Sequence, residues 1–315
     1  MIETYLGKTI KKNREAQGLS QEKLCEGICS VPTLSRIENE GKIPSRDRAT
    51  ALLQRLGLSA DRYYMMISKY DADIDRLESE INSYYLQYDR AQGEARECAR
   101  MQGVQKLQEL KIIVKKNDRI GQQFLLRTEA ILGEANRTYD ASEQLAKLMD
   151  AIRLTIPKFD LDKINDFLYS LDELKILTQV AVRQAKTGNL KKSIKTLEQL
   201  FDYVQEHNRS MNQSAGQLPL IAYNYAIKLG QAKRYNDAIE IAEVGRRSCI
   251  DCGNYHLLPG FMHIQAECYY FLGDNADSRT LYTRAYHFYQ SIENTRDLEI
   301  LEGEASRYLN LTFTD

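Results

Sequence analysis

The sequence predicts an all-α protein with a small N-terminal domain followed by a larger array of helical repeats. Gly and Pro are sparse, at 17 and 5 of 315 residues, and charged residues make up 28%, which is typical of long solvated helices. The length is about twice that of an ordinary domain, which favours two folding units. A pattern of small and apolar residues also recurs in the C-terminal half.

Charge is distributed unevenly along the chain. Residues 1–60 carry 10 Lys and Arg against 7 Asp and Glu, a net charge of +3, whereas the other residues carry 33 against 37, a net charge of -4. This excludes a protein coated with basic residues over its whole surface, and it favours a local nucleic-acid site in the first 60 residues.

Several classes of protein are not supported by the sequence. The longest uncharged stretch, Ser210 to Ile227, is rich in polar residues, so no membrane contact is expected. No secretory signal is visible, and six irregularly spaced cysteines fit a reducing compartment, so we predict a cytoplasmic protein. Nucleotide-binding loops and hydrolase motifs are not found, which predicts a non-enzyme without a cofactor or a metal.

The first 60 residues predict short helices separated by a tight turn. Gly18 ends a first helix, Ser20 is the N-cap of a second that runs to about Gly27, and Ser30 is the N-cap of a third. Pro32 suits the first turn of that third helix. Such a pair of helices can place the third helix in the major groove of DNA.

The segment from Leu6 to about Leu58 resembles the helix-turn-helix of phage repressor and Cro-type regulators. The resemblance rests on Arg14, on Gly18-Leu19-Ser20-Gln21 and on Leu34-Ser35-Arg36-Ile37-Glu38-Asn39. The turn Gly27-Ile28-Cys29-Ser30 is one residue shorter than the commonest pattern and is similar to that of peptide-responsive regulators of the Rgg, NprR and PlcR type, the RNPP family. The resemblance implies a double-stranded DNA operator and pairing between Arg14 and Glu38.

Residues near the predicted third helix are the candidates for DNA contact. Thr33, Ser35 and Arg36 can donate hydrogen bonds to bases, and Val31 can touch a thymine methyl. The Gln21 backbone and amide can meet the phosphate backbone. The full set is Gln21, Ser30, Val31, Thr33, Ser35, Arg36, Lys42, Ser45 and Arg46, with Lys42, Ser45 and Arg46 better placed for phosphates than for bases.

The remainder of the chain contains degenerate repeats. A turn at Gly188, Lys233 or Gly273 is followed five places later by a small residue, Ser193, Ala238 or Ser278. These frames resemble tetratricopeptide repeats, which predicts a right-handed α-superhelix with a concave wall. Residues 70–115 predict an earlier helix pair, and Asp297 to Leu309 a closing helix. The predicted domains are 1–62 (helix-turn-helix), 63–92 (connecting helix and start of the array) and 93–315 (repeats).

An extended concave wall suits a peptide better than a compact metabolite. Amides can hold the backbone of a peptide and cations can meet a carboxylate. The predicted wall residues are Arg127, Gln179, Lys186, Tyr223, Asn224, His263 and Glu267. Together with the resemblance, this favours a transcription regulator of the quorum-sensing type that binds a short signalling peptide and acts as a homodimer on two half-sites.

Two other functions remain open from the sequence. The repeats could bind a partner protein such as a response regulator, with DNA binding secondary. Cys249 and Cys252, a CxxC pair with His256 nearby, could also form a redox or metal sensor, although packing is the commoner role of such cysteines.

Overall fold

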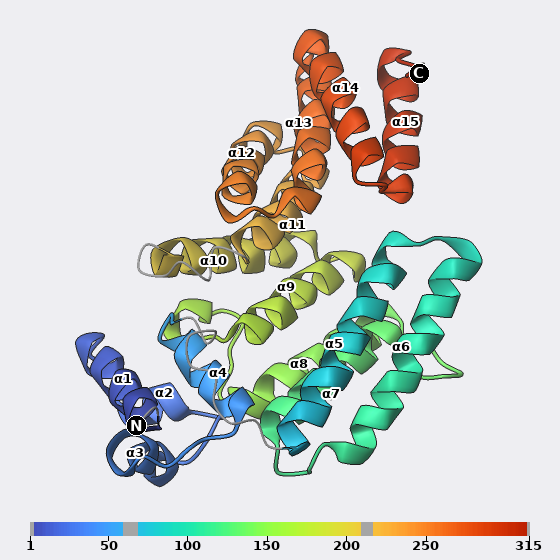
Figure 1. Cartoon of the computed structure of the whole chain (residues 1–315). Helices are drawn as coiled ribbons and strands as arrows, with labels where there is room; N and C mark the ends of the chain where they lie inside the picture. Colours follow the sequence, from blue (N-terminus) through green and yellow to red (C-terminus); the bar gives the residue numbers. More distant parts are fainter. Residues whose placement is uncertain (1–2, 59–68, 209–216, 314–315) are drawn as a thin grey trace.

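The computed structural model describes residues 3–58, 69–208 and 217–313, and these residues form helices without a β-strand (Figure 1). The N-terminal domain, called the head below, contains α1 (Glu3–Ala16), α2 (Gln21–Cys25), α3 (Val31–Glu40) and α4 (Arg46–Arg55). The following helices, called the body, are α5 (Lys69–Arg90), α6 (Gly93–Ile113), α7 (Arg119–Leu132), α8 (Ala141–Thr155), α9 (Leu171–Lys186), α10 (Leu190–Asn208), α11 (Leu218–Gln231), α12 (Tyr235–Cys252), α13 (Leu258–Leu272), α14 (Asn275–Ser291) and α15 (Thr295–Leu309), with the short 3₁₀ helices Ile164–Asp166 and Tyr255–Leu257.

The caps predicted in the head are confirmed. The side chain of Ser20 accepts a hydrogen bond from the backbone N–H of Lys23, and that of Ser30 accepts one from Thr33. These bonds satisfy N–H groups that the first turn of a helix leaves without a partner. Pro32 lies in the first turn of α3, where no such N–H is needed.

The second helix ends at Cys25, two residues before the predicted end at Gly27. Gly27 has a φ of +73°, a backbone conformation that interrupts the helix and favours glycine. A Cβ atom at this position would also lie 1.4 Å from the backbone oxygen of Thr155 in α8. The turn before α3 therefore packs directly against the body.

The repeat frame predicted from the sequence is also found in the structure. Ser193, Ala238 and Ser278 are fully buried, which allows α10, α12 and α14 to pack closely against the preceding helices. Pro219 and Pro259 lie in the first turns of α11 and α13. The expected early pair is formed by α5 and α6, and the closing helix is α15.

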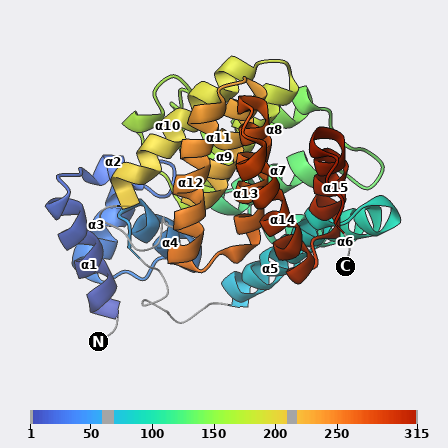
Figure 2. The same ribbon diagram turned by 90° about the horizontal axis from the view of Figure 1, so that it is seen from above.

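The two ends of the body meet. Arg296 at the start of α15 donates from Nη1 to the backbone oxygen of Asp89 at the end of α5, at 2.5 Å. Gln92 Nε2 lies 3.4 Å from Glu299 Oε2 in the same region. Figure 2 shows α15 beside α5 and α6. Helices at opposite ends of the array are thus in contact.

The part of the predicted connector at 63–68 lies outside the described residues, and so does the predicted domain boundary at 62, which stays a prediction. The connector is helical from Lys69 to Arg90, in α5, which ends two residues before the predicted end at 92. None of the helices within the described ranges has both the length and the apolar character required to cross a membrane.

Candidate DNA-binding head and ligand-binding body

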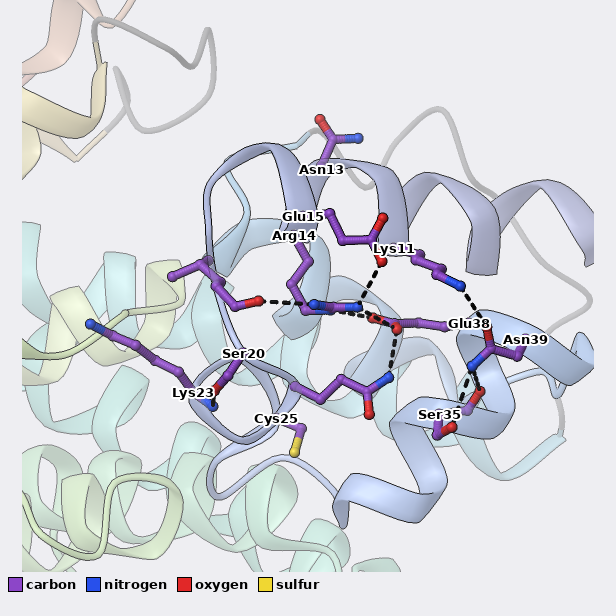
Figure 3. Close-up of polar contacts among 12 residues, drawn as sticks. Lys11, Asn13, Arg14, Glu15, Ser20, Lys23, Cys25, Ser35, Glu38 and Asn39 are labelled. Atoms are coloured by element: carbon purple, nitrogen blue, oxygen red, sulfur yellow. Dashed lines mark hydrogen bonds and ion pairs between the residues drawn. The ribbon is translucent and has the colours of Figure 1, made fainter.

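A buried ion pair joins α1 to α3 in the head (Figure 3). Arg14 Nε lies 2.7 Å from Glu38 Oε1, and Arg14 Nη2 lies 2.9 Å from Glu38 Oε2. The remaining Arg14 nitrogen, Nη1, donates to the backbone oxygen of Leu19 at 2.9 Å, and the bond to Glu38 raises the pKa of Arg14. The implied Arg14–Glu38 pair is confirmed, and it fixes the first and third helices relative to each other.

Gln21 belongs to the same cluster. Its amide nitrogen donates to Glu38 Oε2 at 2.7 Å. The amide nitrogen is thus engaged within the head, because a buried carboxylate with an open acceptor site attracts the nearest donor, and the contact of Gln21 with DNA stays a prediction. The N-terminal end of α2 remains available for a backbone contact with phosphate.

The exposed face of α3 carries the predicted base-reading residues. Arg36 is exposed, and Val31, Thr33 and Ser35 are half-buried. The hydroxyls of Ser30 and Thr33 are 2.9 Å apart, so part of their hydrogen-bonding capacity is used within the helix terminus. Arg36 therefore has the greatest reach from α3 among the predicted contacts.

The three residues predicted to meet phosphates have different surroundings. Lys42 is exposed, and Ser45 is the half-buried N-cap of α4, where its side chain makes no capping hydrogen bond. Arg46 forms an ion pair with Asp75 of α5. This ion pair links the start of α4 to the body, and the contact of Arg46 with phosphate stays a prediction.

The junction of head and body contains residues that the sequence analysis missed. Arg55 Nη2 lies 3.1 Å from Glu173 Oε1 of α9, and each side chain is 2% exposed. Gln54 Oε1 accepts a hydrogen bond from the backbone N–H of Leu171 at 3.1 Å. The only sequence signal for Arg55 was a charge inside the apolar run Ala51-Leu52-Leu53-Gln54-Arg55-Leu56, which marks a buried charge that needs a partner.

A cavity of about 180 Å³ lies at this junction. Its wall includes Arg46 and Gln54 of the head, Glu78 of α5 and Arg127 of α7. Burial is the main cause that raises the pKa of Glu78 to about 8, and Asp47 adds to it. Arg127 is 7% exposed, and its Nε has no hydrogen-bond partner. The predicted wall residue Arg127 thus lies directly beside the head.

The predicted wall residues other than Asn224 lie on the side of α7, α9, α11 and α13 that faces α5 and α15, which we call the inner wall. Tyr85 of α5 shows this: burial raises its pKa, and Arg127 and Arg183 act in the opposite direction from α7 and α9. On α9, Gln179 Oε1 is buried without a hydrogen-bond partner, and Lys186 is exposed.

The predicted wall residues on α11 and α13 make more contacts with other residues of the protein than those on α9 do. The ring of Tyr223 packs edge-on against Phe261 at 5.6 Å between centroids. The Asn224 amide nitrogen donates to Leu220 of its own helix at 2.8 Å, so its oxygen and its second N–H are left for a ligand. His263 Nε2 lies 2.7 Å from Glu304 Oε2, and Glu267 is half-buried nearby.

The Cys249–Cys252 pair lacks the reactive thiolate that a redox or metal sensor needs. Burial raises the pKa of Cys249 to about 12, and a thiol that resists ionisation is a poor nucleophile and a poor metal ligand. Cys252 is exposed. Among the residues described, no group of three or more His, Cys, Asp or Glu is arranged to hold a metal ion. These observations give the redox or metal-sensor alternative no support.

This geometry defines the class of protein: a helix-turn-helix head attached to an α-helical repeat body. A helix-turn-helix sequence model matches residues 10–63. The model described as the RNPP family C-terminal domain matches residues 149–310, just over half of the chain. The chain therefore belongs to the RNPP family.

Solved structures agree on the fold, whereas no curated protein matches the chain in sequence. PlcR of Bacillus thuringiensis in complex with the peptide PapR7 and DNA is 21% identical, with 95% of this chain and 99% of that chain covered and a TM-score of 0.61. The apo form of PlcR is 19% identical, with 96% and 99% covered and a TM-score of 0.57. At this identity the likeness shows the fold alone.

Proposed function

We propose that the chain is a sequence-specific transcription regulator whose head binds double-stranded DNA and whose inner wall binds a short signalling peptide. The observation that carries this proposal is the arrangement at the junction: α3 presents Arg36 outward, while α4 is anchored at the end of the inner wall beside Arg127. Membership of the RNPP family supports it, and PlcR, which shares the fold, has been solved with a peptide and DNA.

The proposed mechanism couples the wall to the head. Arg127 lines the junction cavity together with Arg46 and Gln54 of the head. A peptide that contacts Arg127 therefore changes the electrostatic interactions of these head residues. The position of α4, and with it the whole head, then responds to occupancy of the wall. Because one head covers few base pairs, we propose that a homodimer places two heads on half-sites roughly 34 Å apart.

The test is fluorescence anisotropy of the full-length protein on DNA from the region upstream of its gene, at stated salt. The probe is a low-mass fraction of spent culture medium, used before and after protease treatment. We expect a protease-sensitive change in DNA affinity that the Arg36→Ala protein does not show. DNA binding that ignores the fraction would favour a partner protein as the ligand of the repeats, and the lack of any specific DNA binding would refute the proposed role of the head.

A further inference from the structure

The inner wall carries three positive charges that form no ion pair with an acidic side chain among the described residues. Arg183 Nε of α9 donates to the neutral Gln144 at 2.6 Å, and Lys228 Nζ of α11 donates to the neutral Gln231 at 3.1 Å. Lys186, at the end of α9, is exposed. Within the described residues these three cations form no ion pair, and the hydrogen bonds of Arg183 and Lys228 go to amide oxygens. Asp89 of α5 acts on Arg183 electrostatically without forming an ion pair with it. The three cations are called the cation cluster below.

The members of the cation cluster repel each other and their cationic neighbours. Lys186 is accessible to solvent but partly desolvated by the surrounding protein, which lowers its pKa, and Arg183, Arg96 and Arg296 lower it further. Burial also lowers the pKa of Lys228, which is 9% exposed, and Lys186 adds to this effect. A like charge nearby and removal from water both disfavour the charged form. The folded protein thus keeps an unfavourable concentration of positive charge at this place, which a bound anion would relieve.

The other end of the inner wall has the opposite character. Burial raises the pKa of Glu267 of α13, and the nearby Glu304 of α15 raises it further. Glu304 also accepts the only described hydrogen bond of the His263 side chain. An anion is therefore disfavoured beside α13 and favoured beside α9 and α11. The electrostatic potential of the wall thus differs between its two ends.

We propose that the cation cluster of Arg183, Lys186 and Lys228 binds a carboxylate of the signalling peptide, so that the regulator selects peptides that carry this group at the α9–α11 end of the wall. The proposal rests on the proposed function and specifies the chemistry of its ligand. The carboxylate has two possible sources, the side chain of Asp or Glu and the free C-terminus. A guanidinium and two ammonium groups can satisfy either one with charge-assisted hydrogen bonds.

The experiment uses four pools of heptapeptides made without Asp, Glu, Lys or Arg at the random positions. The central residue is Glu or Gln, and the C-terminus is a free acid or an amide. The full-length protein is mixed with each pool, and retained peptides are measured by gel filtration and mass spectrometry. We expect pools with a carboxylate to be retained about tenfold or more above the Gln amide pool, since a hydrogen bond to a charged group has this effect. The comparison of Glu amide with Gln acid identifies the source of the carboxylate.

The variant Arg183→Gln/Lys186→Gln should abolish the preference, and Lys186→Gln alone should reduce it without disturbing a buried side chain. The matched control, Lys191→Gln/Lys192→Gln, removes the same charge from exposed positions of α10 and should keep the preference. Equal retention of all pools, or equal loss in the control, would overturn this proposal and leave the proposed function standing. Retention of no pool would also overturn this proposal, and the anisotropy experiment with spent medium decides the proposed function independently.

Discussion

Arg55 and Glu173, 118 residues apart in the chain, form a buried ion pair that joins the head to the body. Arg55 also donates to the backbone oxygens of Leu24 and Glu26, at 3.1 and 2.6 Å, so it ties the end of α2 to α4 as well. Glu173 completes the capping box of α9 by accepting from the backbone N–H of Ser170 at 2.6 Å. One pair of side chains therefore connects three elements whose relative positions orient α3.

The first prediction concerns this pair. Arg55→Ala leaves a buried carboxylate at Glu173 without its cation and should lower the free energy of unfolding by about 3–5 kcal/mol. Chemical denaturation monitored by circular dichroism measures the loss. The double variant Arg55→Ala/Glu173→Ala should be more stable than the sum of the two single losses predicts, because the pair couples the sites. Additive losses would show that the two residues act independently.

The second prediction is a pH dependence due to Glu78 at the junction. Its folded pKa of about 8 lies above the ordinary value, so the folded protein holds a proton that the unfolded chain has already released. Stability therefore falls as the pH rises from about 4.5 to about 8. Glu78→Gln should flatten this part of the profile of melting temperature against pH, with a gain of a few °C near pH 8. Glu94→Gln, at an exposed position of α6, is the control and should leave the slope unchanged.

The third prediction compares two helical glycines. A Cβ at Gly245 of α12 would lie 2.3 Å from Cζ of Phe261, whereas a Cβ at Gly303 of α15 meets nothing within 4 Å. Gly245→Ala should destabilise the protein by about 1–3 kcal/mol through overpacking. Gly303→Ala should stabilise it by about 0.5–1 kcal/mol, because alanine loses less conformational entropy in a helix. Thermal unfolding of both proteins measures the difference, and equal shifts would refute the predicted close packing of α12 on α13.

The fourth prediction separates DNA contact from head stability. Arg36→Ala removes an exposed side chain of α3 and should weaken specific DNA binding about 5-fold to 150-fold while the melting temperature stays unchanged. Arg14→Ala removes the buried partner of Glu38 and should lower both DNA affinity and the melting temperature. Anisotropy titrations and thermal melts of the two variants give the comparison. A drop in melting temperature for Arg36→Ala would assign that residue to the fold instead.

Local sequence was sufficient to predict the helices and the positions of the repeats. The caps at Ser20 and Ser30, the first-turn proline at Pro219 and the buried Ser193 all act on residues within a few positions or repeat at a regular interval. Hydrogen-bonding capacity, backbone restriction and side-chain volume are properties of single residues, so they can be read without knowledge of distant neighbours.

The directions of long polar side chains were decided by the tertiary structure. The Gln21 amide bonds to Glu38 and Arg46 pairs with Asp75, and the sequence analysis predicted neither of these contacts. The sequence by itself determined an all-α chain with a helix-turn-helix and phased repeats. Only the folded chain determined that Arg55 meets Glu173, because a long flexible side chain takes the partner that packing brings within about 3 Å, and that partner lies far away in sequence.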